Sequence, residues 1–339
     1  MTDSTSDSFR MPAEWSPHEL TLVAWPQREE AWRGTTIEAA RDTHAAVVDA
    51  VSRFEPVLLV VHPSQLSEVR SRISGRNVEI LATPIDDSWL RDSGPIIVTD
   101  GSGARAGIDF RFNAWGEAFK PYLNDAAVSA VILAYLGIER FEQSLVLEGG
   151  SIAVDGEGLL VTTEQCLLDP TRNPTLGKTE IEGRIRGPLG ADRVVWLDQG
   201  LIEDADTDGH VDNICAFTEP NKVILQTVAD ESDPNWAGTR ENLSRLTEAS
   251  IEIVEWDLLP RIERGNGESV VVPYMNFYLV NGGLIVPVSG VDPDMDIEAL
   301  RRLSDLFPGR EAVGIDGRVL ALGGGGIHCI TQQIPRSAV

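Results

Sequence analysis

The chain is poor in cysteine. Only three of its 339 residues are cysteines, and Cys166, Cys215 and Cys329 lie far apart along the sequence. This spacing excludes a disulfide framework and a CxxC metal site, and it suits a reducing compartment. We therefore expect a cytoplasmic protein.

Basic residues are also scarce. There are 28 Lys and Arg against 53 Asp and Glu, which gives a formal net charge of -25 at pH 7. Nucleic-acid binding needs a basic footprint, so we expect no nucleic-acid partner. The acidic balance favours a cationic ligand by electrostatic steering, although adaptation for solubility produces the same composition.

Long apolar runs and interdomain linkers are missing as well. The longest apolar stretches, such as residues 57–61, have the length of a strand, so we expect no membrane partner. The polar start MTDSTSDSFR lacks the features of a secretory signal, and we expect residues 1–10 to form a disordered tail. Since no linker rich in Pro, Gly or Ser divides the rest, we expect a single domain over residues 11–339.

What the sequence does have is an internal repeat. Five segments place a polar or glycine-rich turn directly before an apolar strand: DSWLRDSGPIIV (87–98), LEGGSIAV (147–154), DGHVDNICAF (208–217), YMNFYLVNGG (274–283) and GGGGIHCITQQ (323–333). When the segments are marked at Asp92, Gly150, Asp212, Asn276 and Cys329, the spacings are 58, 62, 64 and 53 residues. The period of about 60 residues indicates a repeat architecture.

The stretches between these turns also resemble one another. Hydrophobic patterns predict strands at 57–61, 159–163, 223–227 and 284–288, and helices at 36–53, 122–136, 174–186, 236–249 and 296–307. We expect the first helix to begin with a capping box formed by Thr35 and Glu38. The predicted fold class is α/β, a five-unit α/β propeller with pseudo-fivefold symmetry whose polar turns all face the central axis. A doubly wound sheet also fits alternating strands and helices, but it does not predict five similar turns.

Cys329 is the candidate nucleophile. It follows four consecutive glycines and His328, and glycines permit close approach of the backbone to a ligand. A thiolate is the reactive form of such a cysteine, whereas the alternative is an inert buried thiol. A phosphate cradle is excluded because no Lys-Ser/Thr follows the glycines. Cys166 and Cys215 lie in apolar strand contexts and are expected in the core.

His210 and Asp212 are candidates for acid–base chemistry and cation binding. Alternation along a strand puts residues two apart on the same face, so the two side chains are expected to point the same way. A metal site uses the same residue types but needs three or four ligands, and the other histidines are scattered, so we expect no metal. The alternative is a structural hydrogen-bonded pair.

Two further turns offer carboxylates. Asp92 precedes Gly94-Pro95 and either caps the backbone or binds a planar cation by bidentate hydrogen bonds. Trp89, three residues earlier, is placed to cover a guanidinium by a cation–π contact. Glu148 precedes two glycines and is placed to keep His210 protonated, unless it is a surface acid.

The motifs MPAEWSPHELTLVAWP (11–26), DDSWLRDSGP, DFRFNAWGEAF (109–119), LEGGSIAVDGEG, DTDGHVDN and GGGGIHCITQQIP resemble those of the agmatine deiminases. These belong to the guanidine-modifying (pentein) superfamily, which includes arginine and peptidyl-arginine deiminases. The resemblance covers nearly the whole chain from about residue 11 and implies the five-unit pentein fold.

The resemblance also implies roles for particular residues. Cys329 matches the nucleophile and His210 the general acid and base, with Glu148 as the partner of the histidine. Asp92 and Asp212 match the carboxylates that bind the guanidinium; the two matching tryptophans are Trp89, expected over the substrate, and Trp115, expected to line the aliphatic part of the pocket.

The implied reaction converts agmatine into N-carbamoylputrescine and ammonia through an amidino-cysteine intermediate, a step of putrescine biosynthesis. It needs no cofactor, and the resemblance further implies a homodimer.

Three alternatives remain open from the sequence. A related deiminase would act on arginine, peptidyl-arginine or another small guanidine, although no pair of arginines near the motifs forms an evident clamp for an α-carboxylate. A non-enzymatic pentein would bind a ligand without turnover. A metal-dependent hydrolase would be revealed by bound metal. The chain also departs from its relatives at Gly326, where a polar residue is expected before Ile327.

Overall fold

The computed structural model describes residues 9–265 and 267–337. The chain divides into two compact units: unit 1 is Met1–Ser16, Asp92–Asp257 and Pro335–Val339, and unit 2 is Pro17–Arg91 and Leu258–Ile334. Most of the expected tail, residues 1–8, lies outside the described residues, but Arg10 forms an isolated antiparallel bridge with Thr99. A single domain over residues 11–339 stays a prediction.

Within its described residues, unit 1 contains three sheets that share one topology. In each, a first strand pairs antiparallel with a second, which pairs parallel with a third. A helix connects the parallel pair, because parallel neighbours need a crossover connection. The strands are β4 (Ile96–Thr99), β5 (Arg105–Arg111) and β6 (Glu139–Val146); β7 (Ile152–Val154), β8 (Leu159–Thr163) and β9 (Arg193–Leu197); and β10 (Cys215–Glu219), β11 (Lys222–Gln226) and β12 (Glu252–Trp256).

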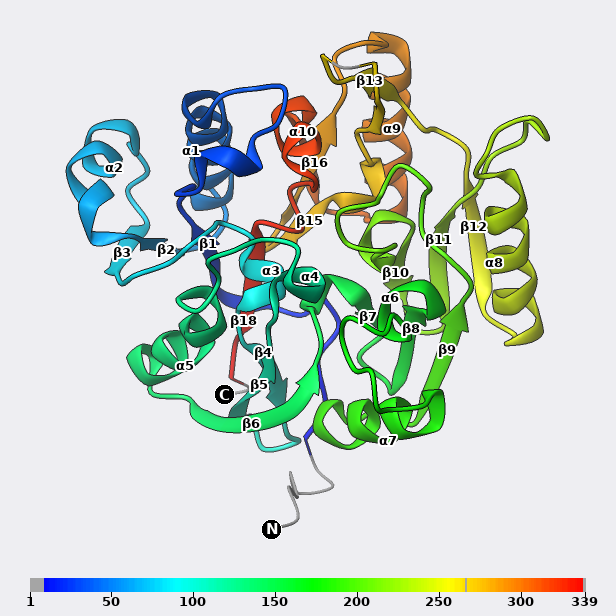
Figure 1. The fold of residues 1–339 in the computed structure, drawn as a ribbon, viewed down its shortest axis with the longest axis horizontal. Helices are drawn as coiled ribbons and strands as arrows, with labels where there is room; N and C mark the ends of the chain where they lie inside the picture. The colour runs from blue at the N-terminus through cyan, green and yellow to red at the C-terminus, as the bar shows by residue number, and fades with distance from the viewer. Residues whose placement is uncertain (1–8, 266, 338–339) are drawn as a thin grey trace. The chain divides into compact units, whose positions relative to one another are not determined.

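The crossover helices of unit 1 are α5, α7 and α8. Gly137 ends α5 in the left-handed conformation, with a φ of 66°, and Gly190 ends α7 in the same way. α8 packs against β9 and β12 (Figure 1). The helices and 3-10 turns of this unit are α4 (Ala114–Glu117), α5 (Asp125–Leu136), α6 (Glu164–Leu167), α7 (Lys178–Leu189), α8 (Trp236–Glu248), η3 (Gly149–Ser151) and η4 (Val211–Asn213).

Unit 2 repeats the arrangement of strand, strand, helix and strand. β15 (Tyr278–Val280) pairs antiparallel with β16 (Gly283–Val288), and α9 (Pro293–Leu306) leads to the parallel β17 (Glu311–Asp316). A second sheet has the order β18 (Thr331–Pro335), β1 (His18–Ala24), β2 (Val57–Val61), β3 (Val78–Ala82), with α1 (Ile37–Ser52) between β1 and β2. The other elements of unit 2 are the hairpin β13 (Arg261–Glu263) and β14 (Ser269–Val271), α2 (Leu66–Arg72), α10 (Arg318–Gly323), η1 (Glu29–Ala31), η2 (Pro63–Gln65) and η5 (Tyr274–Asn276). The short α3 (Leu90–Ser93) contains the boundary between the two residue ranges.

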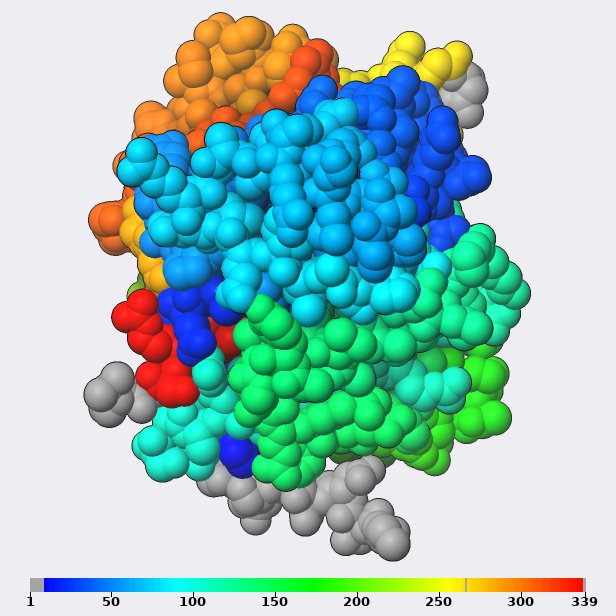
Figure 2. Space-filling model, turned by 90° about the vertical axis from the view of Figure 1, so that its left-hand side faces the viewer, coloured from blue at the N-terminus to red at the C-terminus, as the bar shows by residue number. Residues whose placement is uncertain are grey.

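In unit 2, burial differs between an inner strand and an edge strand of the same sheet. All five residues of β2 are buried, and this strand lies inside the sheet with β1 on one side and β3 on the other. β3 is the edge strand and is half-exposed; it lies in the light blue surface of Figure 2, together with α2. Among the described residues, no helix is long and apolar enough to cross a membrane.

The structure confirms the α/β class and the predicted strands and helices, with ends shifted by a few residues. The five predicted turns each lead directly into a strand, namely β4, β7, β10, β15 and β18. One sheet of the doubly wound kind is not found in the described residues, where the strands form separate small sheets. The five-unit ring itself stays a prediction.

The predicted cap of the first helix was wrong by one residue. The N-cap is Thr36, whose hydroxyl accepts from the amide of Ala39 at 3.1 Å. Glu38, the expected partner of Thr35, instead forms ion pairs with Arg41 and Arg72. Adjacent threonines offer the same hydroxyl, so the sequence alone did not distinguish them.

Candidate active site

Asp92, His210 and Asp212 converge beside Gly150 in unit 1. A Cβ atom at Gly150 would lie 2.7 Å from His210 Nδ1 and 2.9 Å from both Asp212 Oδ2 and Asp92 Oδ1. The amide of Gly150 also donates to Asp92 Oδ1 at 2.9 Å. A side chain at position 150 would therefore collide with all three groups, which explains the glycine in this turn.

The route by which His210 and Asp212 come together differs from the prediction. The expected strand begins only at Cys215, whereas Asp212 lies in η4 and His210 directly precedes it. The backbone of this turn is fixed by hydrogen bonds: His210 N donates to Asp204 Oδ2 at 3.2 Å, and Thr163 Oγ1 donates to the carbonyl of Gly209 at 2.8 Å. A 3-10 turn, rather than strand alternation, brings the imidazole and the carboxylate together.

Burial and mutual charge shift the titration of this cluster. Burial raises the pKa of Asp92 to about 6, and the carboxylates of Asp212 and Glu148 add to the rise. For His210, burial favours the neutral imidazole, but the carboxylates of Asp92, Asp212 and Glu148 together raise its pKa above the usual value. The cluster therefore favours a protonated histidine beside acidic groups.

Neither ring nitrogen of His210 has a hydrogen-bond partner among the described residues, although the side chain is fully buried. His210 Nδ1 lies 3.8 Å from Asp92 Oδ1, which is too long for a hydrogen bond. Buried polar groups are normally paired. An imidazole without a partner in a polar cluster is therefore a candidate for contact with a ligand or for proton transfer.

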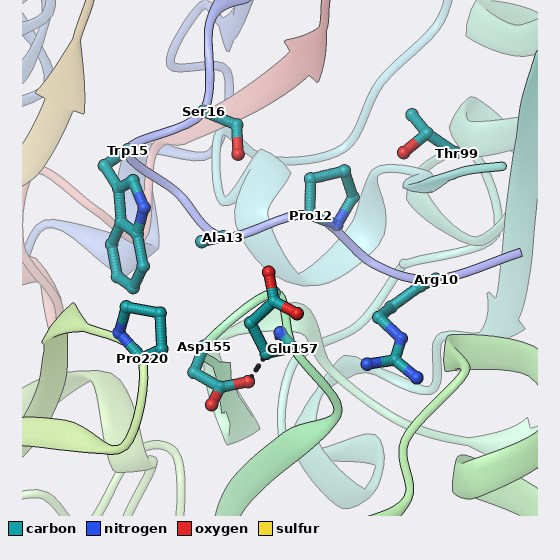
Figure 3. A pocket seen from close by; sticks show the side chains of 10 residues that line it. Arg10, Pro12, Ala13, Trp15, Ser16, Thr99, Asp155, Glu157 and Pro220 are labelled. Atoms are coloured by element: carbon teal, nitrogen blue, oxygen red, sulfur yellow. Dashed lines mark hydrogen bonds between the residues drawn. The ribbon is translucent and has the colours of Figure 1, made fainter. Parts of the chain in front are cut away.

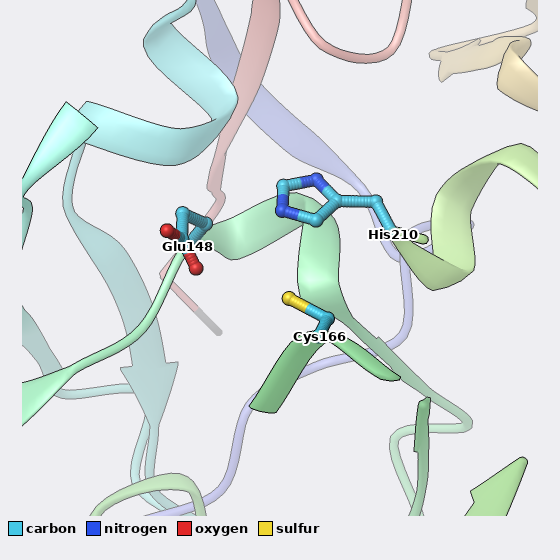
Figure 4. A group of neighbouring side chains, drawn as sticks. All are labelled: Glu148, Cys166 and His210. Carbon is cyan, nitrogen blue, oxygen red and sulfur yellow. The ribbon is translucent and has the colours of Figure 1, made fainter. Parts of the chain in front are cut away.

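Glu148 and Cys166 lie next to this imidazole. A carboxylate oxygen of Glu148, Cys166 Sγ and a ring nitrogen of His210 all lie within 4.8 Å of one another (Figure 4). Burial raises the pKa of the Cys166 thiol well above its usual range, with Glu148 adding to the rise. Cys166 and Cys215 are buried, as the sequence predicts for core residues, but the sulfur of Cys166 also lies close to His210 and Glu148.

Arg172 joins Glu148 to the turn that precedes His210. Its Nε donates to Glu148 Oε1 at 3.2 Å, and its Nη2 donates to the carbonyl of Thr207 at 3.0 Å. Nη1 forms an ion pair with Asp208. Burial would lower the pKa of Arg172, but the Glu148 and Asp208 carboxylates raise it, so the guanidinium stays charged. One buried cation thus orients Glu148 and anchors residues 207–208.

The residue types of Glu148, Cys166 and His210 are those that bind zinc, and three ligands suffice for a catalytic metal. However, Arg172 already places a positive charge on Glu148, which disfavours a second cation at this carboxylate. The expectation of a reaction without metal stays a prediction.

Trp115 contacts the cluster through its indole. Nε1 donates to Asp92 Oδ2 at 2.9 Å, and the ring forms T-shaped contacts with Phe112 and Phe119, with centroid distances of 5.1 and 5.6 Å. Trp115 has a φ of 53° and Ala114 a φ of 54°. Both angles lie in the left-handed region, which residues other than glycine rarely adopt. This strained turn aims the indole at Asp92.

Cys329 and Trp89 lie together in unit 2. A Cβ atom at Gly325 would lie 2.5 Å from Trp89 Cζ3 and 3.2 Å from Cys329 Cβ. Trp89 stacks on Trp32 with ring centroids 5.7 Å apart and an interplanar angle of 26°. Asn276 reaches the sulfur: its Nδ2 donates to Cys329 Sγ at 3.2 Å.

The four-glycine run before Cys329 is explained by its neighbours. A Cβ atom at Gly323 would lie 2.5 Å from the Trp32 ring, and one at Gly326 would lie 2.3 Å from Asn276 Oδ1. Gly324 has a φ of 101° and ends α10. Steric contacts therefore require glycine at positions 323 and 326, and the left-handed backbone favours it at position 324. These reasons explain the run of glycines without a phosphate-binding role.

A separate pocket of unit 1 contains none of the predicted site residues (Figure 3). Its volume is about 180 Å³, and its lining includes Arg10, Trp15, Asp155 and Glu157. Two of its charged side chains have partners within the unit: Asp155 Oδ1 accepts from the amide of Glu157 at 2.8 Å, and Arg10 Nη2 donates to Asp192 Oδ2 at 2.7 Å. The cluster around Gly150 is therefore the better candidate for the active site of unit 1.

In unit 1 the structure thus brings together the predicted residues Asp92, Trp115, Glu148, His210 and Asp212, and in unit 2 Trp89 and Cys329. Sequence reasoning missed Arg172 and Asn276 as parts of these clusters. Asn276 had a signal, because it marks the fourth of the five similar turns. Arg172 had none, since Glu148 and Asp208, the partners that link it to the cluster, are 24 and 36 residues away in the chain.

Comparisons with known proteins agree with this architecture. The agmatine deiminase of Pseudomonas aeruginosa is 40% identical over 359 residues, which cover 97% of this chain and 96% of that protein. The agmatine deiminase of Pseudomonas fluorescens is 39% identical, with 97% and 96% covered. The solved agmatine deiminase of Enterococcus faecalis has a TM-score of 0.92 and 31% identity, with 98% and 97% covered.

More distant structures agree as well. A C. jejuni agmatine deiminase with substrate bound has a TM-score of 0.89 and 27% identity, with 98% and 97% covered. DDAH of Pseudomonas aeruginosa, at 15% identity and a TM-score of 0.52, shows a likeness of fold alone.

The fold is therefore that of the pentein class of α/β proteins. Residues 10–335 match a family described as Porphyromonas-type peptidyl-arginine deiminase, and the chain belongs to this family.

Proposed function

We propose that this chain is an agmatine deiminase, a hydrolase that converts agmatine and water into N-carbamoylputrescine and ammonia. The observation that carries the proposal is the convergence of Asp92, Asp212 and His210 beside Gly150. Two buried carboxylates suit a planar cation, and the relatives that match nearly the whole chain are agmatine deiminases.

Binding of the guanidinium begins with its charge. Asp92 and Asp212 each accept hydrogen bonds from its N–H groups, which fixes the plane of the cation and places its carbon for attack. Trp115 holds the Asp92 carboxylate through its indole N–H and lines the aliphatic part of the pocket. Trp89, beside Cys329, covers the guanidinium by a cation–π contact.

Cys329 and His210 carry out the first half of the reaction on this carbon. The Cys329 thiolate forms a C–S bond with the guanidinium carbon, and the C–N bond to one terminal nitrogen breaks. Protonated His210 gives its proton to that nitrogen, which leaves as ammonia. An amidino-thioether on Cys329 remains. The raised pKa of His210 supports its role as the acid.

Water completes the reaction. Neutral His210 takes a proton from water, and the resulting hydroxide adds to the carbon. The new hydroxyl group loses its proton to the solvent as the C–S bond breaks, which releases the ureido product and the thiolate. Glu148 lies close to His210 and stabilises its protonated form, and Arg172 holds Glu148 in place. No metal or other cofactor enters these steps.

Several finer assignments accompany the proposal. The repeated strand, strand, helix and strand units support a five-unit propeller. Three free cysteines suit a cytoplasmic enzyme of putrescine biosynthesis, and the resemblance to agmatine deiminases supports a homodimer. Arginine, peptidyl-arginine or another small guanidine is the alternative substrate, and ligand binding without turnover is the non-enzymatic alternative.

The test is ureido-product formation from agmatine, arginine and a peptidyl-arginine at matched concentrations. We expect turnover of agmatine that is abolished in Cys329→Ser. Cys215→Ser is the matched control, because Cys215 is a buried thiol whose pKa is raised to about 12 by burial. Near-native turnover by Cys329→Ser would overturn the mechanism, turnover of another guanidine would overturn the substrate, and silence on all three would favour the binding protein.

A further inference from the structure

Asn276 contacts both the sulfur and the backbone of Cys329. Nδ2 lies 3.2 Å from Sγ, and Oδ1 accepts from the amide of Cys329 at 3.3 Å. Asn276 is fully buried, and Cys329 is 3% exposed. One carboxamide therefore fixes the position of the proposed nucleophile from two sides.

We propose that Asn276 is a catalytic residue that stabilises the thiolate of Cys329 by donating a hydrogen bond from Nδ2 to Sγ. This inference rests on the proposed role of Cys329 as the nucleophile. The contact has a physical consequence because a buried thiolate is costly, and a hydrogen bond to the charged form favours that form.

The carboxamide is suited to both states of the sulfur. A protonated thiol donates to Oδ1, which lies 3.4 Å from Sγ, and a thiolate accepts from Nδ2 at 3.2 Å. An amide keeps these donor and acceptor groups at every pH, so Asn276 contributes no titration of its own. The sulfur therefore has a polar partner both as a thiol and as a thiolate.

Two features fix the amide in this position. The carbonyl of Asn276 accepts from the amide of His328 at 3.1 Å, which ties η5 to the turn that carries Cys329. Gly326 leaves room for the side chain, since a Cβ there would lie 2.3 Å from Asn276 Oδ1 and 2.7 Å from Cγ. The glycine that departs from the expected polar residue thus makes space for the carboxamide.

The experiment measures thiolate formation directly, without substrate. The pH dependence of Cys329 alkylation by iodoacetamide is followed by mass spectrometry of its peptide, and the ultraviolet absorbance of the thiolate is taken as the difference from Cys329→Ser. The variants are Asn276→Asp, which keeps an acceptor for the Cys329 amide but removes the donor, and Asn276→Ala, which removes both. Circular dichroism and thermal unfolding check that each variant is folded.

Gly326→Ala tests the same contact by steric displacement. Its matched control is Gly265→Ala, where a Cβ meets nothing within 4 Å and the residue is exposed. Neither glycine has a positive φ, so backbone strain does not confound the pair.

We expect the midpoint of thiolate formation to rise by about one pH unit in Asn276→Ala and Gly326→Ala, so that alkylation near neutral pH falls about tenfold. Asn276→Asp should raise it further, because a carboxylate repels the thiolate. Unchanged midpoints in folded Asn276→Ala, Asn276→Asp and Gly326→Ala would overturn the inference. Failure of the proposed function can be told apart from failure of this inference, because the two have different readouts. The proposed function fails if turnover survives in Cys329→Ser, whereas the inference depends only on the midpoints of thiolate formation, which are measured without substrate.

Discussion

The indole of Trp115 donates a hydrogen bond of 2.9 Å to Asp92 Oδ2, from a turn whose backbone lies in the left-handed region. This hydrogen bond favours the ionised carboxylate and partly opposes the rise in the pKa of Asp92 that burial causes. The strained turn therefore positions the indole of Trp115 to stabilise the ionised form of Asp92.

The first prediction concerns this hydrogen bond. Trp115→Phe keeps an aromatic ring but removes the donor, so kcat/KM for agmatine should fall about tenfold or more, since hydrogen bonds to charged groups contribute about 1.5–3 kcal/mol. The acid limb of the activity profile should also move to higher pH. Steady-state kinetics across pH measure both effects, and an unchanged acid limb would contradict the role.

The second prediction is the pH dependence of the enzyme itself. Asp92, with a pKa of about 6, must be ionised to bind a guanidinium, so kcat/KM should fall as pH drops through about 6. His210 must be protonated for the first step, and its pKa is raised, so activity should persist above the usual pKa of histidine before it declines. The expected profile is a bell. A profile that is flat between pH 5 and 7 would refute the assignment of Asp92.

The third prediction tests the convergence beside Gly150. Gly150→Ala should abolish turnover while the protein stays folded, because the new Cβ would lie within 3 Å of three functional atoms. Gly183→Ala is the matched control: it lies in α7 with nothing within 4 Å and should be as active as the wild type. Turnover and thermal unfolding are compared for the pair; near-native activity of Gly150→Ala would mean that the cluster is not the site.

The fourth prediction concerns the buried pair of Glu148 and Arg172, whose side chains are both fully buried. Arg172→Met leaves the carboxylate without its cation and should cost about 3–5 kcal/mol of unfolding free energy. Adding Glu148→Gln to this variant removes the unpaired charge and should recover part of the loss. Urea unfolding of the single and double variants measures the coupling. Equal stabilities of the two would show that the charge of Glu148 is not what Arg172 offsets.

The fifth prediction uses His44 in α1, whose burial lowers the pKa from 6.5 to about 4. His44 binds a proton more readily in the unfolded chain than in the folded one. The contribution of its neutral imidazole to the unfolding free energy is therefore fully present above pH 6.5 and is lost as pH falls towards 4. The shift corresponds to about 3 kcal/mol. His44→Leu should lose correspondingly less unfolding free energy between these two pH values, as measured by urea unfolding. An identical pH dependence in the variant would rule out His44 as the source.

How far the sequence predicts this molecule depends on the range of the interactions. Residues 57–61 and 159–163 are β2 and β8 to the residue. β2 is a continuous apolar run, as is typical of a fully buried strand, and β8 combines leucines with the β-branched Val and Thr, which favour strands. Local chemistry was less decisive at Thr35 and Thr36, where either hydroxyl was able to cap α1. The short η4 was predicted as a strand, since a single turn has too few residues for a periodic pattern.

The candidate site shows the same division. Asp92, His210, Asp212 and Cys329 were found because each lies in one of the repeated turns. Arg172 was not, because its importance comes from Glu148 and Asp208, which only the folded chain brings to it. Cys166 was rightly placed in the core, but nothing in its apolar sequence neighbours indicated that its sulfur lies close to the imidazole of His210.

The cluster around Gly150 also has a surplus of negative charge. Its buried carboxylates are those of Asp92, Glu148 and Asp212, while the described cations that face them are Arg172 and a protonated His210. Arrival of a guanidinium supplies the counter-ion for this imbalance. Binding and folding are then thermodynamically linked: the ligand that the enzyme consumes should also raise its melting temperature, and inert monoamines should do so far less.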